Sequence, residues 1–404
     1  MNTERKDSYP ALIPWGWGRY HQNGAEPERT GNALAPEFAE QPGTMTGERP
    51  GTARDGDVPT RPGLVPARVT GHQHHHYTLV CAPDAHRLRS RVSGAFSYRA
   101  AGPDDYPTVG DWVLLDTETG TIQEVLPRRT AISRKTAGSE TLEQVIVANI
   151  DVALLVFAMD VGRGFTVGLV ERAATTAWNS GARPVIVLNK VDLADAPTRD
   201  RILRDAETAA PGVEIYTVSA RDGTGVSELL SNIAPDETVG MLGKSGVGKS
   251  ALLNALARER GSEIGAREGE LRSGDLQGRH TTTDKQLYLL PGGPIIADVP
   301  GLRELQLWAD EASLDETFPE IEELSRECRF NDCTHTGEPG CRIQEALSSG
   351  ELPIDRYERY LDLQREIAYL NRRRDQRAQQ EEEMKWKKIA QHIRNYKKIT
   401  RDLG

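Results

Sequence analysis

The feature that most constrains this chain is the run Gly243-Lys244-Ser245-Gly246-Val247-Gly248-Lys249-Ser250, which fits the phosphate-loop pattern G-x-x-x-x-G-K-[ST]. Glycine permits a tight turn, so Gly246 and Gly248 let successive backbone N–H groups point at phosphate oxygens. Lys249 can reach the β- and γ-phosphates, and the Ser250 hydroxyl can bind Mg²⁺. Residues 237–242 are predicted as a short strand, and the helix predicted from Ala251 adds a favourable dipole for anions. A glycine-rich turn without a ligand is the less favoured alternative.

A second signal, Asn189-Lys190-Val191-Asp192, follows the apolar strand predicted at 184–188. The Asp192 carboxylate can accept hydrogen bonds from guanine N1–H and N2–H₂, a donor pair that adenine lacks. Asn189 can connect the base edge to the phosphate loop, and the Lys190 stem can cover the ring face. Ser219-Ala220, after the next predicted strand, can present a backbone N–H to guanine O6. N-K-x-D alone is often only a helix start, but this succession predicts a guanine site and disfavours an ATP-dependent kinase or ATPase.

A third signal, Asp298-Val299-Pro300-Gly301, follows an apolar strand predicted at 295–297. Asp298 can hold Mg²⁺ through water, and the Gly301 N–H can meet the γ-phosphate, although a simple strand-ending turn is the alternative. The polar segment 262–284, which ends in Gly278-Arg279-His280-Thr281-Thr282-Thr283, is predicted to switch between order and disorder. One of its threonines would complete the Mg²⁺ shell when the γ-phosphate is present. The sequence does not distinguish the three; Thr282 is the working candidate.

The residue after this third motif is Leu302, where Ras-like enzymes carry the glutamine that orients the attacking water. Leucine cannot hydrogen-bond water, so we predict slow intrinsic hydrolysis that needs a partner. His280 is the candidate for orienting the water, together with Lys249 and Thr282 as catalytic residues. The motif order is also informative: N-K-V-D precedes the phosphate loop, the reverse of Ras-like enzymes, which predicts a circular permutation.

A metal site is predicted from the spacing Cys328-x₄-Cys333-x-His335-x₅-Cys341. Three thiolates and one imidazole suit tetrahedral Zn²⁺, and the absence of an open position favours a structural site over a catalytic one. Small buried thiols are the alternative. Cys81 lies far away in the chain and is predicted to be an ordinary core residue. Four cysteines in 404 residues make no disulfide framework and are typical of a reducing compartment.

The chain is predicted to be a multidomain α/β protein of four parts. Residues 1–62 form a Gly/Pro-rich, mostly disordered extension. Residues 63–138 form a small barrel, most simply an OB-fold. Residues 139–309 form a parallel α/β domain, and residues 310–404 form a helical, zinc-binding domain with a basic tail. Within the extension, the aromatic stretch 12–20 either docks on the body, which we favour, or stacks on RNA.

Charge gives local rather than global hints of a nucleic-acid partner. The chain carries a net charge of −10, so only local basic surfaces could bind RNA. The tail 371–404 has 11 Lys/Arg against 5 Asp/Glu, a net charge of +6, and is either an RNA contact or a solvated helix. The histidine run 72–76 is predicted to be an exposed loop that connects two strands rather than a metal tract. No apolar run or N-terminal signal pattern predicts a membrane location. The barrel's basic residues could line an RNA face or simply be solvated; they are Arg87, Arg89, Arg91, Arg99, Arg128, Arg129, Arg134 and Lys135.

Taken in this order, the motifs resemble the circularly permuted, small-subunit-dependent ribosomal GTPase family (RsgA). The resemblance covers about residues 64–345 and also includes Val109-Gly110-Asp111-Trp112-Val113 and Ala148-Asn149-Ile150-Asp151. It implies GTP hydrolysis stimulated by the 30S ribosomal subunit, a role in late 30S maturation, and binding to 16S rRNA. GTP or GDP with Mg²⁺ and one structural Zn²⁺ are the ligands expected from the motifs. The cysteine usage and the lack of a membrane or signal pattern predict a cytoplasmic protein, and we also expect a monomer. The competing hypothesis is a non-enzymatic, GTP-dependent RNA-binding module, which Leu302 slightly favours.

Overall fold

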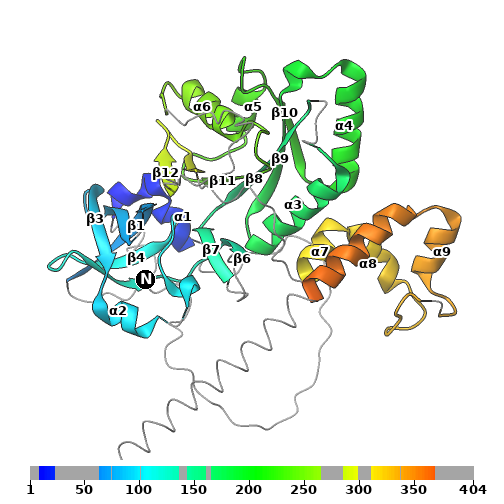
Figure 1. The fold of residues 1–404 in the computed structure, drawn as a ribbon, viewed down its shortest axis with the longest axis horizontal. Helices are drawn as coiled ribbons and strands as arrows, with labels where there is room; N and C mark the ends of the chain where they lie inside the picture. The colour runs from blue at the N-terminus through cyan, green and yellow to red at the C-terminus, as the bar shows by residue number, and fades with distance from the viewer. Residues whose placement is uncertain are drawn as a thin grey trace, which may run out of the picture.

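The computed structural model shows a barrel, a large α/β sheet and a helical C-terminal region, arranged side by side (Figure 1). The barrel contains the earlier strands, the α/β sheet the middle of the chain, and the helical region its later part. The structure describes residues 9–22, 63–73, 75–100, 102–135, 143–160, 165–264, 285–298, 311–336 and 338–368. The predicted domain boundaries fall at or beside residues outside these ranges, so they stay predictions.

The barrel is closed by five strands, as expected for an OB-fold. Its elements are β1 (Leu64–Gln73), β2 (His76–Cys81), β3 (His86–Val92), α2 (Gly94–Arg99), β4 (Trp112–Asp116) and β5 (Thr121–Val125). The order β1-β2-β3-β5-β4 closes because β1 also pairs with β4. The barrel core includes Ala67, Leu79, Cys81 and Val113, all fully buried, so the prediction for Cys81 is confirmed.

The structure refines two predictions for the barrel. The histidine run connects two strands, as predicted, but its first and last residues are themselves strand, because His72 lies in β1 and His76 begins β2. The basic residues do not form one solvated set. Arg128 donates to the fully buried Asp111 carboxylate at 2.8 Å, and Arg129 donates to the Arg19 carbonyl at 3.0 Å. Arg87, Arg89 and Arg91 on β3 are exposed.

The α/β sheet has the strand order β10-β9-β8-β11-β13-β12, parallel except for β12. Its elements are β8 (Val152–Ala158), α3 (Val167–Ser180), β9 (Arg183–Asn189), η3 (Val191–Leu193), α4 (Ala196–Ala209), β10 (Glu214–Val218), α5 (Val226–Ser231), β11 (Thr238–Leu242), α6 (Lys249–Glu259), β12 (Lys285–Leu289) and β13 (Ile295–Asp298). Every residue of β8 is buried, as expected for a strand covered on both faces. Leu155 and Phe157 face α3 and α4, whereas Leu154 and Val156 face α5 and α6.

A short hairpin connects the barrel to this sheet. It pairs β6 (Ala131–Lys135) with β7 (Glu143–Ala148). Strand β12 also pairs with β1, so the barrel and the α/β sheet share one continuous set of hydrogen-bonded strands.

The C-terminal region has its own apolar core. It contains α7 (Glu311–Thr317), α8 (Pro319–Arg326), α9 (Arg342–Ser349) and a helix over residues 354–368. Phe318, Ile343 and Ile367 are fully buried in this core. The region packs on α3, where the buried carboxylate of Glu171 pairs with Arg356 and Arg359 at 2.7 Å each. Across the described residues, the helices are too short or too polar to cross a membrane.

The N-terminal stretch before the barrel forms two short helical elements, η1 (Pro10–Trp15) and α1 (Trp17–Gln22). Leu12, Trp15 and Trp17 are buried, with exposed fractions of 0, 6 and 2%. The prediction that these aromatics dock on the body is therefore confirmed.

Candidate nucleotide site and metal cluster

The predicted phosphate loop connects the end of β11 to the start of α6. Gly246 and Gly248 have φ values of 86° and 96°, the left-handed conformations that favour glycine. A Cβ on Gly248 would lie 2.4 Å from the Asn189 amide nitrogen, so this position requires glycine on steric grounds as well. The Lys249 ammonium donates to the carbonyls of Gly243 at 2.6 Å and Lys244 at 2.8 Å, which keeps its positive charge at the loop.

Asn189 joins three motifs that are far apart in the sequence. Its side chain is almost completely buried, with the residue only 1% exposed. The Nδ2 amide donates to the Val247 carbonyl in the phosphate loop at 2.9 Å, and Oδ1 accepts the backbone N–H of Ala220 at 3.1 Å. The structure thus brings the predicted base-reading loop, the Ser219-Ala220 loop and the phosphate loop into one place.

The base-reading side of the site is open to solvent. Lys190 lies between β9 and η3 and has a left-handed φ of 64°. Asp192 lies in η3 and is exposed. The Lys190 ammonium pairs with the Asp160 carboxylate at 2.6 Å, a contact that sequence reasoning missed because Asp160 follows a different strand. Val191 begins η3 and is partly buried.

The Ser219-Ala220 loop is positioned as expected, but its N–H groups are already engaged. Ser219 donates its backbone N–H to the Thr224 carbonyl at 2.9 Å, and Ala220 donates to Asn189. Arg258, near the end of α6, donates to the Ala220 carbonyl at 3.1 Å. Both N–H groups thus have partners within the protein, and the role of this loop toward guanine O6 stays a prediction.

The candidate magnesium ligands come from neighbouring strands and their loops. Asp298 ends β13, which pairs in parallel with β11, so Asp298 lies at the same sheet edge as the phosphate loop. Ser250 lies in the first turn of α6. A hydroxyl and a carboxylate oxygen are ligands that suit Mg²⁺, so these residues fit the ion chemically. The structure does not describe most of the switch segment, from residue 265 to 284, so the roles of His280 and Thr282 stay predictions. The same holds for Gly301 and Leu302, which follow β13.

The four predicted zinc ligands form one cluster. The ligand atoms of Cys328, Cys333, His335 and Cys341 all lie within 4.8 Å of one another. His335 Nδ1 is 3.6 Å from the Cys328 sulfur and 3.5 Å from the Cys341 sulfur. Tetrahedral Zn²⁺ with ordinary bond lengths requires S···N separations of about 3.6 Å, so the donor set and its geometry both fit zinc.

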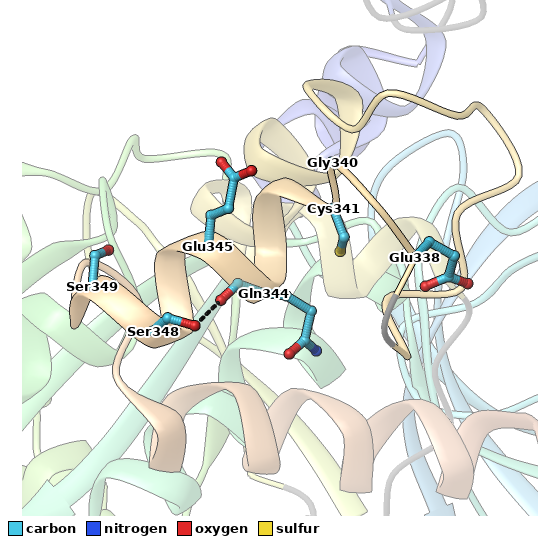
Figure 2. A pocket seen from close by; sticks show the side chains of 7 residues that line it. All are labelled: Glu338, Gly340, Cys341, Gln344, Glu345, Ser348 and Ser349. Atoms are coloured by element: carbon cyan, nitrogen blue, oxygen red, sulfur yellow. Dashed lines mark hydrogen bonds between the residues drawn. The ribbon is translucent and has the colours of Figure 1, made fainter.

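The surroundings of the cluster act differently on two of its thiols. Burial acts to raise the pKa of the Cys328 thiol, but hydrogen bonds from the backbone N–H groups of Arg342 and Ile343 and from the Cys333 and Cys341 thiols lower the pKa overall. Burial raises the pKa of the Cys333 thiol to about 11. Gln344 fixes the ligand loop by donating to the His335 carbonyl at 2.6 Å. Figure 2 shows the open groove beside the cluster, with Gln344 and Cys341 on the side of α9 and Glu338 across from them. This groove is separate from the phosphate loop.

These features define a class: a circularly permuted P-loop GTPase fold with a β-barrel before it and a Cys₃His cluster after it. A sequence model of the RsgA GTPase family matches residues 125–308. The chain belongs to the RsgA GTPase family. The predicted resemblance and fold class are therefore confirmed.

Named relatives and solved structures agree with this assignment. The chain is 41% identical over 304 residues to the small ribosomal subunit biogenesis GTPase RsgA 1 of Oceanobacillus iheyensis, covering 74% of this chain and 84% of that protein. It is 40% identical over 350 residues to the RsgA of Opitutus terrae, covering 83% and 92%. The crystal structure of YjeQ from Thermotoga maritima matches with a TM-score of 0.55 and 27% identity, covering 76% of this chain and 99% of that one. YloQ, described as a circularly permuted GTPase, matches with a TM-score of 0.54 and 25% identity, covering 77% and 98%.

Proposed function

We propose that this chain binds GTP between the Asn189–Asp192 loop and the phosphate loop and hydrolyses it to GDP and phosphate. We further propose that it does so on the small (30S) ribosomal subunit, in the cytoplasm, during late maturation of that subunit. The observation that supports the pocket most strongly is the double hydrogen bond of Asn189, to Val247 and to Ala220. The relatives named as small-subunit biogenesis GTPases support the ribosomal partner.

Each residue has a distinct part in the proposal. Asp192 selects guanine through its carboxylate, and Lys249 neutralises the charge that develops on the phosphates during transfer. Ser250 and Asp298 would hold Mg²⁺, which supplies further charge neutralisation when bound. The zinc cluster would hold the ligand loop together rather than take part in the reaction, since four protein ligands leave no open position. His280 and Thr282 remain the candidates for orienting water and completing the magnesium shell.

The proposal is tested by GTP turnover with and without purified 30S subunits. Wild type should be slow alone and clearly faster with 30S. Lys249→Ala should remove turnover in both conditions, because it deletes the phosphate-binding charge. Asp192→Asn should shift nucleotide preference from guanine toward xanthine, whose N1–C2 edge matches an amide. Absence of turnover by wild type under both conditions would leave only the non-enzymatic binding module, and an unchanged preference in Asp192→Asn would refute the guanine pocket.

A further inference from the structure

The N-terminal segment, defined as residues 9–22, lies across the junction between the barrel and the α/β sheet (Figure 1). On the barrel side, the Trp17 ring packs edge-on against Trp112 with centroids 4.7 Å apart. Tyr20 stacks on Trp17 at 5.9 Å and donates its hydroxyl to the Pro127 carbonyl at 2.8 Å. Large buried aromatic rings contribute strongly to such contacts, so the segment is firmly attached to the barrel.

The same segment also contacts the chain that leads into the phosphate-loop strand. Arg19 pairs with Asp236 at 2.9 Å and with Glu237 at 3.8 Å, the two residues that precede β11. Gly16 has a φ of 84°, and a Cβ there would lie 3.3 Å from the Asp236 carbonyl and 2.8 Å from the Arg68 guanidinium. Only a glycine therefore lets the segment approach both neighbours so closely.

The buried side chain of Arg68 connects the N-terminal segment to β11. It lies on β1 of the barrel and is only 1% exposed. Its guanidinium donates to the Trp15 carbonyl, to the Asn149 carbonyl at 3.2 Å and to the Thr238 hydroxyl at 2.8 Å. It also lies over the Trp112 ring, 5.3 Å from the centroid. Burial lowers its pKa to about 10, which still leaves it charged at neutral pH. A buried charge with several fixed partners holds its neighbours in one arrangement.

Strand β11 carries this restraint to the nucleotide site. Thr238, which Arg68 contacts, is its first residue, and the phosphate loop begins immediately after its last residue, Leu242. The barrel reaches the magnesium side of the site as well. Gly71 on β1 pairs with Gln286 on β12, and Gln286 pairs with Asp298 on β13. One barrel strand thus contacts β11 directly through Arg68 and is linked to β13 through β12.

We propose that Arg68 and the N-terminal segment form a joint that positions the phosphate loop relative to the barrel. A partner that displaces the barrel would then act on the nucleotide site through β11. Arg68, Trp17 and Arg19 are positioning residues in this view, since none of them lies in the predicted nucleotide pocket. The consequence for regulated hydrolysis rests on the proposed function, whereas the joint itself does not.

The joint is tested by hydrogen exchange of the β11 amides and by GDP binding, measured on the full chain. Arg19→Ala removes an ion pair that is partly exposed, so we expect exchange in β11 to rise about 2- to 5-fold. Arg68→Met removes buried charged hydrogen bonds, so we expect a rise of at least about tenfold. In both variants the Kd for GDP should rise as well. Arg201→Ala is the matched control, because Arg201 forms an ion pair with Asp205 on α4.

The amides of β9, in the same sheet, separate a local effect from general destabilisation. If exchange rises equally in β9 and β11, or if it rises in β11 while the Kd for GDP is unchanged, the joint does not position the loop. Arg19→Ala keeps the test decisive if Arg68→Met fails to fold. Turnover of wild type with 30S is measured separately: a missing stimulation would refute the proposed function, and the exchange data would still decide the joint.

Discussion

Replacing Asn189 by alanine should weaken nucleotide binding far more than the loss of an ordinary surface amide. The change removes two hydrogen bonds, at 2.9 and 3.1 Å, and leaves the Val247 carbonyl and the Ala220 N–H without these partners. Each bond contributes about 0.5–1.5 kcal/mol net, so the pair contributes about 1–3 kcal/mol. Because these bonds hold the base-reading and phosphate loops together, we expect the Kd for GDP to rise about 5- to 150-fold.

The assay is a titration with a fluorescent guanine nucleotide, and Asn232→Ala is its matched control. The Asn232 side chain also makes two hydrogen bonds, with Arg183 at 2.8 Å and Glu214 at 3.0 Å. Arg183 starts β9 and Asn189 ends it, so the control site lies about 20 Å from the pocket. A Kd within twofold of wild type for Asn189→Ala would show that this residue does not join the two loops.

Two further predictions concern the C-terminal region. Arg356→Met leaves the buried Glu171 carboxylate with Arg359 as its remaining cation. Docking of the C-terminal region on α3 should therefore weaken by about 3 kcal/mol. Native-state proteolysis measures this change. Arg365→Met is the control, since Arg365 pairs with the exposed Asp362 on the same helix; equal cleavage rates would contradict the prediction. Zinc removal should expose three thiols to a thiol reagent, whereas the fourth, Cys81, should react only after unfolding, because burial raises its pKa to about 12. Three reactive thiols before chelation would argue against bound zinc.

The sequence alone determined the features that depend on local spacing. A phosphate loop is a backbone turn set by its own glycines, and Gly246 and Gly248 do have the left-handed conformations expected of them. The buried character of β8 and the ligand set at 328–341 are likewise encoded over short stretches. The reversed motif order also predicted the circular permutation, because strand pairing in a sheet does not depend on where the chain begins. The histidine run was correctly placed between two strands, but the sequence did not show that His72 and His76 belong to those strands.

Only the tertiary structure decided which distant residues meet. Arg68 contacts Thr238 across 170 positions, and Arg356 contacts Glu171 across 185, and neither pair has any local spacing that would predict it. The pairing of Lys190 with Asp160 and the use of the Ala220 N–H by Asn189 also depend on adjacent strands ending at one sheet edge. Sequence patterns encode which side chains must be buried or exposed along each element. The partner of a buried charge is fixed only when the elements pack, because that partner must lie within hydrogen-bond reach in three dimensions.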